Sequence, residues 1–591
     1  MPTVTINEKT IEVPEGTTIL EAAKKAGVNI PTLCYMEGLP PMGACRVCLV
    51  EVEGARTLVA SCVTPVSDGM RVQTHSARVR EARRTVVELM LSDHEGDCQT
   101  CDRSEDCELQ ALARELGIRE VRYPGEKTVS RTDDSTPAMV RDSAKCVLCR
   151  RCVSVCNEVQ GVGALFPQNR GLNTYIGPAF CRDLDEVVCV QCGQCAAVCP
   201  VGAISEKDQI DEVWSALDDP NKTVLVQTAP AIRAALGECF GYPPGTLVTG
   251  KMTAALRRLG FDGVFDTEFT ADLTIMEEGS ELLMRLKKAL LDEEEVALPQ
   301  FTSCCPAWIK FAEHFYPQLL PNISTCKSPQ QMFGPVAKTY YAEKLGKKPE
   351  ELYVVSVMPC TAKKYEHGRP EMTDSGSIDV DVVLTTRELG RMIQQSGLDF
   401  ISLPDEQMDA PFGLSSSGAA DIFANTGGVM EAALRTAYAI VTGRPLPFED
   451  LHVKPIAGLE GIKEASLTIE DPVEEWSFLN GVSVNVAVAH GLGNARRVIE
   501  RILSGEAAYH FVEVMACPGG CIGGGGQPRM TDDSVRQARI DAIYREDEGK
   551  EIRTSHENPE IIQIYEEYFG KPLGERSHHL LHTHYVERSP I

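Results

Sequence analysis

The 591-residue sequence has no apolar run long enough to cross a membrane, and its N-terminus has no basic segment followed by an apolar one. A membrane helix needs about 18 or more apolar residues, and a secretory signal needs both segments. An excess of positive charge is also missing, since 85 acidic residues outnumber 58 basic ones and give a net charge of −27. We therefore expect no membrane span and no nucleic-acid binding, and we predict a cytoplasmic protein.

The cysteine content is also too low for a small disulfide-rich protein, although cysteine is conspicuous. The 23 cysteines make up about 4% of the chain, below the roughly 8–10% of small disulfide-rich proteins, yet most of them lie in clusters. In a reducing cytosol, clustered cysteines are typical of metal ligands rather than disulfides. At roughly 150 residues per domain, the length indicates about four domains. The sequence therefore predicts a multidomain metalloprotein.

Hydrophobic periodicity predicts different folds at the two ends of the chain. Near the N-terminus, two short strands precede a helix over residues 18–26, where Thr18 and Glu21 form a capping box. This order suits a small α+β domain of the β-grasp, ferredoxin-like type. Further helices are expected over residues 79–91 and 107–116. From about residue 206, strand-like and helical runs alternate, which predicts an α/β domain. The predicted strands there cover residues 223–227, 352–357, 380–384 and 482–490, and the predicted helices cover 232–236, 252–259 and 282–291.

The first cysteine set follows the β-grasp pattern directly. It consists of Cys34, Cys45, Cys48 and Cys62. Four thiolates with one Cys-x2-Cys pair are what a 2Fe-2S cluster requires, but they also satisfy tetrahedral zinc. The surrounding fold pattern favours the iron–sulfur cluster.

A second set combines one imidazole with three thiolates. It consists of His94, Cys98, Cys101 and Cys107. Taken alone, this set fits structural zinc as well as a 4Fe-4S cluster with one histidine ligand. Its position between other redox-type clusters favours the 4Fe-4S cluster.

The third region contains two copies of the bacterial ferredoxin spacing, in which the fourth cysteine of each copy binds the cluster of the other copy. One predicted cluster takes Cys146, Cys149, Cys152 and Cys199. The other takes Cys189, Cys192, Cys195 and Cys156. A double match to this spacing rarely arises by chance, so we expect two 4Fe-4S clusters here.

Five further cysteines lie in three distant segments that are rich in glycine and proline. The segments are Thr302-Ser-Cys-Cys-Pro-Ala-Trp308, Met358-Pro-Cys-Thr-Ala-Lys-Lys-Tyr-Glu366 and Met515-Ala-Cys-Pro-Gly-Gly-Cys-Ile-Gly-Gly-Gly-Gly-Gln-Pro528. Any one of them alone is more typical of a buried structural thiol on a turn. Together they closely resemble the three signatures of the iron-only (FeFe) hydrogenases, and the order of the N-terminal clusters resembles that of the long bacterial members.

This resemblance implies an H-cluster, in which a 4Fe-4S cluster is joined to a two-iron subsite with CO, cyanide and azadithiolate ligands. The implied 4Fe-4S ligands are Cys305, Cys360, Cys517 and Cys521. Cys304 is implied as the thiol that exchanges protons at the subsite, and Lys363 as a donor to cyanide. The implied pocket residues are Pro230, Ala231, Gln330, Met358, Phe423 and Met515. Ala231 occupies a position where some members have a serine, so that one contact is not expected here.

The resemblance also implies a proton path beyond Cys304. Its members here are Glu278, Glu281, Ser324 and Arg285. Glu278 and Glu281 are three residues apart, so on a helix they share a face. Without the resemblance, a solvent-exposed helix surface is the simpler interpretation of these two acidic residues.

These inferences define five segments. Residues 1–77 are predicted to be the 2Fe-2S domain, 78–120 the 4Fe-4S domain with one histidine and three cysteine ligands, 121–140 a linker, 141–205 the domain with two 4Fe-4S clusters, and 206–591 the α/β H-cluster domain. The resemblance implies reversible oxidation of H2 to protons and electrons, with the electrons passing through the four accessory clusters. It also implies that maturation enzymes act on the chain.

The C-terminal sequence and acidic composition resemble those of the catalytic subunit of the multimeric NAD(P)-linked, often electron-bifurcating, members of this family. The resemblance implies separate flavin- and nicotinamide-binding iron–sulfur subunits. A stand-alone enzyme that uses ferredoxin is the alternative. An electron-transfer or cluster-assembly protein and an H2 sensor are less favoured. The first two lack support because Cys304, Lys363 and the H-cluster cysteines are all present, and no signalling domain is visible for a sensor.

Some features have no role in this interpretation. Residues 484–496 resemble a dinucleotide-binding turn, but Arg496 occupies the third glycine position, so no nicotinamide or flavin is expected on this chain. The histidine-rich segment 577–585 is interpreted as solvent-exposed or as a docking surface rather than a metal site. Cys181, Cys239 and Cys326 are expected to be small buried apolar residues.

Overall fold

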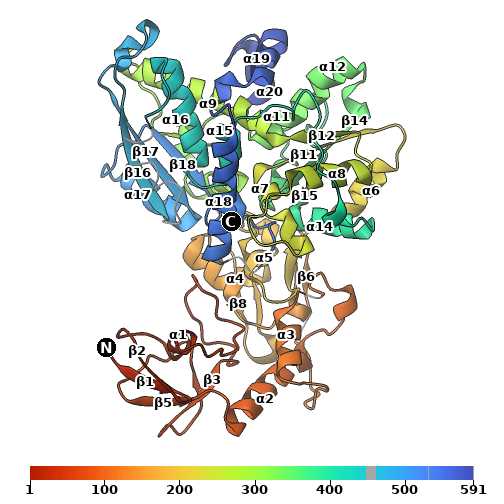
Figure 1. Cartoon of the computed structure of the whole chain (residues 1–591), viewed down its shortest axis with the longest axis vertical. Helices are drawn as coiled ribbons and strands as arrows, with labels where there is room; N and C mark the ends of the chain where they lie inside the picture. The colour runs from red at the N-terminus through yellow and green to blue at the C-terminus, as the bar shows by residue number, and fades with distance from the viewer. Residues whose placement is uncertain (105, 129, 448–460, 530–531, 590–591) are drawn as a thin grey trace. The chain divides into compact units, whose positions relative to one another are not determined.

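The computed structural model describes residues 1–104, 106–128, 130–447, 461–529 and 532–589 (Figure 1). The chain divides into two compact units. Unit 1 contains residues 1–159, 163–189 and 198–205, and unit 2 contains residues 160–162, 190–197 and 206–591. Within the described residues, no helix combines the length and apolar character that a membrane span requires.

Unit 1 begins with a five-stranded sheet in the order β2-β1-β5-β3-β4. The predicted N-terminal helix is confirmed as α1 (Ile19–Lys25), and the Thr18–Glu21 capping box is present at its start. Strand β1 pairs antiparallel with β2 and parallel with β5, and alternate residues such as Val4 and Ile6 are buried. The strands are β1 (Thr3–Ile6), β2 (Lys9–Glu12), β3 (Leu49–Val52), β4 (Val59–Ala60) and β5 (Met70–Gln73).

The rest of unit 1 consists of short elements around the remaining cysteines. The two predicted helices are confirmed as α2 (Ala77–Asp93) and α3 (Glu108–Glu115). Part of the turn-rich segment before residue 140 is ordered, since β6 pairs with β7 and Asp133 is buried. The other elements are β6 (Thr132–Asp133), β7 (Met139–Asp142), α4 (Arg151–Ser154), β8 (Phe166–Gln168), β9 (Tyr175–Gly177), α5 (Gln194–Val198) and β10 (Ile204–Glu206), of which α5 and β10 extend across the unit boundary.

Unit 2 contains two four-stranded sheets, as expected for an α/β domain. The first has the order β12-β11-β14-β15 and is entirely parallel, and the second has the order β13-β18-β17-β16 with only β16 antiparallel. In Figure 1, β16–β18 lie on one side of unit 2 and the first sheet on the other, with α15, α16 and α18 between them. The strands are β11 (Thr223–Thr228), β12 (Gly263–Asp266), β13 (Gln300–Phe301), β14 (Leu352–Met358), β15 (Val382–Thr385), β16 (Ile462–Thr468), β17 (Ser483–His490) and β18 (Phe511–Met515).

The helices of unit 2 depart from the predictions at two places. The helix predicted over 282–291 begins too late, because α9 extends from Thr267 to Leu290. The first half of α9 is buried and therefore lacks the amphipathic pattern from which a helix is predicted. The helix predicted over 232–236 is displaced, because α7 (Pro230–Arg233) ends before a 3₁₀ turn over Leu236–Phe240. The remaining helices are α6 (Ile210–Leu217), α8 (Thr249–Leu259), α10 (Pro306–Phe315), α11 (Pro329–Val336), α12 (Ala342–Leu345), α13 (Ala362–Glu366), α14 (Thr386–Gln395), α15 (Gly418–Asp421), α16 (Gly428–Thr442), α17 (Leu492–Leu503), α18 (Asp533–Gly549), α19 (Pro559–Ile564) and α20 (Glu575–Leu581).

The sheet topology gathers the three distant cysteine segments. Strands β13 and β18 are adjacent and parallel, so the segments that follow Phe301 and Met515 leave the same edge of the second sheet. Strands β11 and β14 are likewise adjacent and parallel, and Pro230 and Cys360 follow their carboxyl ends. Ligand sites in open parallel sheets form at such carboxyl ends.

Candidate active site

One buried cavity of unit 2 is lined by all five cysteines from the three segments. About 740 Å³ of space there is not filled by protein atoms, a volume that includes some open solvent. The lining residues include Cys304, Cys305, Cys360, Cys517 and Cys521, together with Lys363 and the pocket residues predicted from the resemblance, Pro230, Ala231, Gln330, Met358, Phe423 and Met515. Residues far apart in the sequence therefore meet around a single space.

The donor groups of this cavity fit an iron–sulfur cluster. Burial raises the pKa of Cys360 to about 12 and raises that of Cys305, so these thiols stay protonated unless a cation replaces the proton. Two backbone segments of the cavity wall also pack too closely for any residue but glycine: a Cβ on Gly524 would lie 2.1 Å from the carbonyl oxygen of Pro359. Finally, the buried Oε1 of Gln330 has no hydrogen-bond partner among the described residues.

Lys363 supplies the cation at the cavity wall. Its Nζ donates to the carbonyl oxygen of Cys304 at 3.1 Å and to Glu366 at 2.8 Å. Burial alone would lower the pKa of Lys363, but the Glu366 carboxylate more than offsets this and raises it. The ammonium group therefore stays charged beside the cysteines, where it can stabilise a bound anion.

Cys304 lies within electrostatic range of a buried carboxyl group, Glu278 of α9. Burial, together with the nearby charges of Glu278 and Cys305, raises the pKa of Cys304 well above its usual value. Burial and repulsion by Glu281 raise the pKa of Glu278 to about 8. Oε1 of Glu278 accepts a hydrogen bond from the Ser303 amide at 3.3 Å. Both groups can therefore hold a proton near neutral pH.

The predicted path residues form a hydrogen-bonded chain beyond Glu278. Ser324 Oγ donates to Oε2 of Glu281 at 2.7 Å, and its interaction with Glu278 lowers the pKa of that carboxyl against the larger effect of burial. Glu281 in turn pairs with Arg285 at 2.6 Å. The side chains of Glu281 and Arg285 are 12% and 13% exposed, whereas Glu278 and Ser324 are fully buried. These residues therefore run from a fully buried carboxyl group to partly exposed side chains, and a solvent-exposed helix surface is wrong for Glu278.

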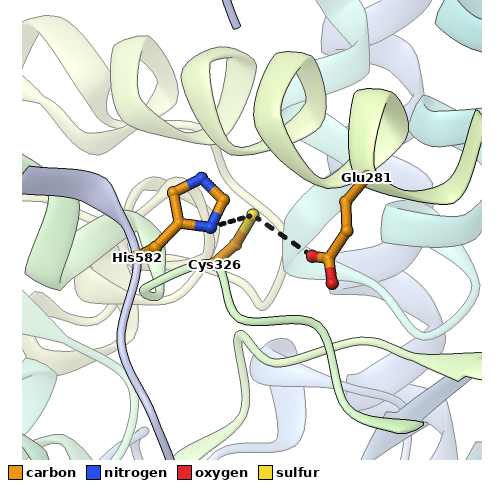
Figure 2. A group of neighbouring side chains, drawn as sticks. All are labelled: Glu281, Cys326 and His582. Carbon is orange, nitrogen blue, oxygen red and sulfur yellow. Dashed lines mark hydrogen bonds between the residues drawn. The ribbon is translucent and has the colours of Figure 1, made fainter. Parts of the chain in front are cut away.

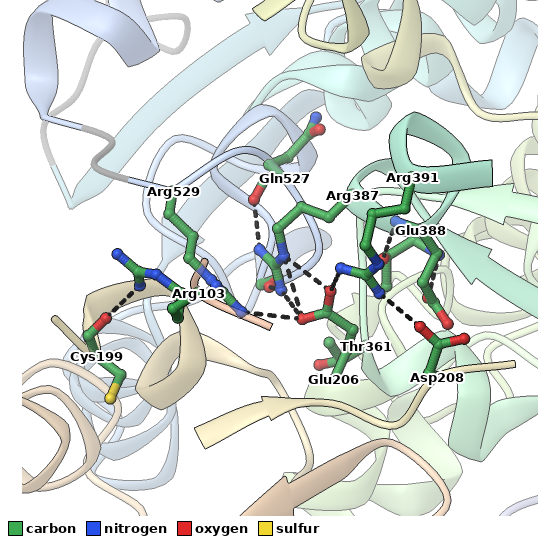
Figure 3. Close-up of polar contacts among 12 residues, drawn as sticks. Arg103, Cys199, Glu206, Asp208, Thr361, Arg387, Glu388, Arg391, Gln527 and Arg529 are labelled. Atoms are coloured by element: carbon green, nitrogen blue, oxygen red, sulfur yellow. Dashed lines mark hydrogen bonds and ion pairs between the residues drawn. The ribbon is translucent and has the colours of Figure 1, made fainter. Parts of the chain in front are cut away.

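A buried ion cluster holds the glycine-rich segment that follows Cys521. Arg387 donates to the carbonyl oxygen of Gly525 and pairs with Glu206 at 2.6 Å, and Arg391 and Arg529 also contact Glu206 (Figure 3). Burial would raise the pKa of Glu206, but the arginines, Arg387 first, hold it well below its usual value. The charged cluster therefore fixes the backbone of this segment.

Part of the ferredoxin-like region also belongs to unit 2 and contacts the same segment. A Cβ on Gly525 would lie 2.4 Å from the carbonyl oxygen of Cys192, and one on Gly193 would lie 2.3 Å from Oγ1 of Thr361. Burial raises the pKa of Cys517 well above its usual value, and the nearby thiols of Cys360 and Cys192 contribute to this shift. Only glycine permits such close packing.

Two of the predicted cysteine sets of unit 1 are assembled. In the first set, Cys48 Sγ lies 3.4 Å from Cys62 Sγ, and Cys45 Sγ accepts from the Cys34 amide at 3.4 Å. In the first ferredoxin-type set, Cys146, Cys149, Cys152 and Cys199 line one small cavity, so the cysteine of the second copy does meet those of the first. The carbonyl oxygen of Cys199 also accepts from Arg103 (Figure 3).

The structure also places members of the other two sets. Cys107 lies within electrostatic range of Cys101, and buried His94 at the end of α2 has an Nδ1 without a hydrogen-bond partner among the described residues. Of the second ferredoxin-type set, Cys156 and Cys189 belong to unit 1, whereas Cys192 and Cys195 belong to unit 2.

Two interpretations of leftover residues are corrected by the structure. His582 is buried rather than solvent-exposed, and its ring lies beside Cys326 and Glu281 (Figure 2). Cys181 is exposed rather than buried, because it follows Phe180 in a surface turn. Part of the signal for the first error was present in the sequence, since Cys326 lies in the same short motif as Ser324, but nothing in the spacing connects it to a histidine 256 residues later.

Comparison with known proteins agrees with this geometry. Residues 222–525 match the family described as the iron-only hydrogenase large subunit, C-terminal domain, and residues 533–588 match the iron hydrogenase small subunit. An NADP-reducing hydrogenase subunit of Solidesulfovibrio fructosivorans is 55% identical over the full length of both chains. The chain belongs to the iron-only (FeFe) hydrogenase family.

Other comparisons cover both halves of this FeFe hydrogenase. Iron hydrogenase 1 of Clostridium pasteurianum is 41% identical over 99% of this chain and 100% of its own length. A variant of the apo FeFe hydrogenase from Chlamydomonas reinhardtii is 45% identical and covers 65% of this chain and 100% of its own, with a TM-score of 0.59. Residues 1–77 match a 2Fe-2S cluster binding domain, 83–122 an iron–sulfur binding region of NADH-ubiquinone oxidoreductase, and 183–205 a 4Fe-4S binding domain. The chain therefore has 2Fe-2S and 4Fe-4S domains in addition to an H-cluster domain.

Proposed function

We propose that this chain is the catalytic subunit of an NAD(P)-linked FeFe hydrogenase that interconverts H2 with two protons and two electrons. The observation that carries the proposal is one cavity of unit 2, where five cysteines from three distant segments meet Lys363, with buried Glu278 within electrostatic range of Cys304. Family membership sets the reaction class, and the cavity supplies the groups that this reaction needs.

In this proposal, Cys305, Cys360, Cys517 and Cys521 hold the 4Fe-4S part of the H-cluster. When bound, the H-cluster supplies the redox chemistry that splits and forms H2. Lys363 would present a fixed positive charge to a bound cyanide, and the apolar residues Met358, Phe423 and Met515 would exclude water. The chain itself contributes ligands, charge and a dry environment.

Cys304 and Glu278 then handle the proton. Cys304 Sγ takes the proton released in the cavity and returns one during H2 formation, since a neutral buried thiol can act in both directions. Glu278, whose pKa is about 8, exchanges that proton with Ser324 Oγ. Glu281 receives it at Oε2, and Arg285 holds the Glu281 carboxylate at the solvent side. Each group has a neighbour within the same buried chain.

Electrons travel through four accessory clusters in this account. The ligand sets are those predicted from the sequence, one 2Fe-2S cluster and three 4Fe-4S clusters. The approach to the H-cluster runs through Cys192, whose carbonyl oxygen packs against Gly525.

We also interpret the N-terminal sheet with α1 as a β-grasp domain and the two paired cysteine sets as a bacterial-type ferredoxin domain. Residues 1–77, 78–120, 141–205 and 206–591 are then the functional domains, with a linker at 121–140.

The electron partners are part of the proposal. The relative from Solidesulfovibrio fructosivorans is named an NADP-reducing hydrogenase subunit, and residues 83–122 match an iron–sulfur region of NADH-ubiquinone oxidoreductase. We infer flavin- and nicotinamide-binding partner subunits in a cytoplasmic complex. Copurification with a flavoprotein from the native host supports this inference, whereas isolation of an active single chain that turns over with ferredoxin supports the stand-alone alternative.

The substitution Cys304→Ala tests the proton role directly. After anaerobic maturation, we expect H2 turnover to fall by about 100-fold or more while the iron content stays unchanged, since the variant removes a proton acceptor and no ligand. Cys239→Ala is the matched control, because Cys239 is a partly buried thiol that does not line the cavity. Normal H2 turnover by the Cys304→Ala variant would overturn the assignment.

A further inference from the structure

Glu513 is a fully buried residue of β18, and its carboxylate anchors the start of helix α16. Oε1 of Glu513 accepts a hydrogen bond from the Gly427 amide at 2.6 Å, and Oε2 accepts one from the Met430 amide at 2.8 Å. Both amides belong to the end of α16 at which backbone N–H groups have no partner within the helix. The Glu513 side chain therefore ties a strand of the second sheet to the first turn of α16.

The segment that is anchored in this way forms part of the cavity wall. Phe423, which precedes α16, lines the cavity. The Thr426 amide donates to the carbonyl oxygen of Gly519 at 3.0 Å, and a Cβ on Gly520 would lie 2.4 Å from the Thr426 nitrogen. Gly519 and Gly520 lie in the sequence between two of the cysteines that are predicted to bind the cluster. The Phe423 segment, residues 422–427, thus packs directly against the loop that bears these cysteines.

The carboxylate of Glu513 also adds negative charge beside the cavity. Alternate side chains of a strand share a face, so Glu513 lies on the same face of β18 as Met515, which lines the cavity. Burial is the main reason that the pKa values of Cys304 and Cys521 are raised, and the charge of Glu513 adds to both shifts. The carboxylate is therefore within electrostatic range of two cavity thiols.

The charge of Glu513 is stabilised by a helix end rather than by a cation. Within the part of the chain that the structure describes, no lysine, arginine or histidine forms an ion pair with Glu513, whereas the nearby Glu431 carboxylate pairs with Arg435. The N-terminal end of a helix carries a partial positive charge, and α16 directs this end at Glu513. The buried negative charge is thus only partly balanced.

We propose that Glu513 is a positioning residue of the H-cluster cavity. Its hydrogen bonds hold the Phe423 segment against the cysteine-bearing loop, and its negative charge lowers the potential at which a cluster in the cavity is reduced. The inference rests on the proposed function, because it concerns the group that the cavity is proposed to hold. Net charge near an iron–sulfur cluster sets its potential, and a lower potential favours H2 evolution over H2 oxidation.

The ionisation of Glu513 sets the conditions of the test. Burial raises the pKa of Glu513 to about 7, although the hydrogen bonds from the α16 amides act in the opposite direction. Measurements are therefore made at about pH 8.5, where the carboxylate is ionised. At this pH the substitution Glu513→Gln keeps the size of the side chain and removes its charge.

Anchoring and charge are measured separately. The anchoring is measured by thermal unfolding of the full chain purified without maturation, and we expect Glu513→Gln to lower the Tm by about 5 °C, since the side-chain NH2 group cannot accept a hydrogen bond. The charge is measured in the anaerobically matured holoenzyme by infrared spectroelectrochemistry. We expect a less negative midpoint potential, CO bands at higher wavenumber, and a severalfold lower ratio of H2 evolution to H2 oxidation with viologen dyes.

Two further variants separate these effects. Asp272→Asn is the matched control, because Asp272 is a buried carboxyl group that accepts from the Ser417 amide at the start of α15 and does not line the cavity. It should lower the Tm and leave the bands and the midpoint potential unchanged. Glu513→Asp keeps the charge on a shorter side chain, so it should lower the Tm and keep a midpoint potential close to that of the unmodified chain.

An unchanged Tm in both Glu513 variants overturns the anchoring. An unchanged midpoint potential in Glu513→Gln, or an equal shift in Asp272→Asn, overturns the role of the charge. If Glu513→Gln yields no folded chain, Glu513→Asp decides: an unmodified Tm overturns the anchoring, and a clearly less negative potential overturns the role of the charge. Absence of CO and cyanide bands from the unmodified chain would instead contradict the proposed function, while the Tm values still decide the anchoring.

Discussion

The two units gather their cysteines in opposite ways. In unit 1, most members of a set lie within a few residues of each other, as in Cys146, Cys149 and Cys152, and a short loop is enough to bring them together. In unit 2, Cys305, Cys360 and Cys517 follow three different strands, β13, β14 and β18, and they meet only when two sheets have formed. Local sites therefore depend on spacing, whereas the cavity depends on the complete fold.

The residues that surround the cysteines also differ between the two units. The cavity of unit 2 is backed by buried ionisable groups, namely the ion pairs of Lys363 and Glu206 and the carboxyl group of Glu278, each held by specific partners. Such groups are costly to bury and strongly destabilising when one partner is lost. We therefore expect a single substitution at the cavity of unit 2 to impair the whole reaction. A single substitution in a cysteine set of unit 1 should affect mainly the cluster that this set binds.

The largest expected contrast is between a cysteine that lines the cavity of unit 2 and a cysteine of an accessory cluster in unit 1. Cys360→Ser should lower H2 evolution from reduced methyl viologen by roughly 1,000-fold or more, because the reaction belongs to the bound cofactor. Cys48→Ser should remove the 2Fe-2S signal in electron paramagnetic resonance and keep a substantial part of that activity, since the dye can donate to other clusters. Comparable loss of activity in both variants would contradict the distinction.

Glu278→Gln should reduce turnover by about 100-fold, because the amide cannot relay a proton. It should also change stability with pH. The Glu278 carboxyl keeps its proton in the folded chain up to about pH 8, whereas in the unfolded chain it ionises near its ordinary pKa. Folding of the unmodified chain therefore weakens between these two pH values, and the variant lacks this effect. Its Tm should rise relative to that of the unmodified chain from about pH 5 to about pH 8. A constant Tm difference over that range would show that Glu278 is not a protonated buried acid.

The Gly525→Ala substitution tests the packing between Cys192 and the cavity segment. The added Cβ would lie 2.4 Å from a carbonyl oxygen, so the backbone must shift, at a cost of about 1–3 kcal/mol. We expect roughly tenfold slower turnover with dye, because the same segment bears Cys521. Gly549→Ala is the control, since nothing lies within 4 Å of its Cβ position. Equal turnover rates for the two variants would show that the packing of this segment against Cys192 does not affect the reaction.

The last contrast concerns ion pairs and is measured as stability rather than as activity. Arg387→Met removes one partner of buried Glu206 and should destabilise the chain by about 3–5 kcal/mol. Glu37→Gln breaks an exposed pair with Lys24 in unit 1, and no measurable change in Tm is expected. Thermal unfolding of both variants checks this, and a large effect at Glu37 would be the unexpected result.

Sequence reasoning was most effective where the relevant interactions are local. The Thr18–Glu21 capping box was predicted correctly, because it depends on residues three positions apart. The long helix α9 was cut short, because burial on all sides of its first half left no helical periodicity to detect.

Tertiary contacts explain the other errors. The bridge between Cys326 and His582 joins segments more than 250 residues apart, which no spacing rule describes. The cavity residues were identified through resemblance to a family, since their convergence depends on the order of strands in two sheets. Whether each of them acts as assigned stays a prediction.

The infrared spectrum of the anaerobically matured chain tests the central claim most directly. The account predicts CO and cyanide stretching bands, since the cavity of unit 2 should hold the H-cluster implied by the family, and predicts their loss in Cys360→Ser. A chain that contains its full complement of accessory iron–sulfur clusters, was matured together with the cluster-assembly enzymes, and still shows no such bands would contradict the account.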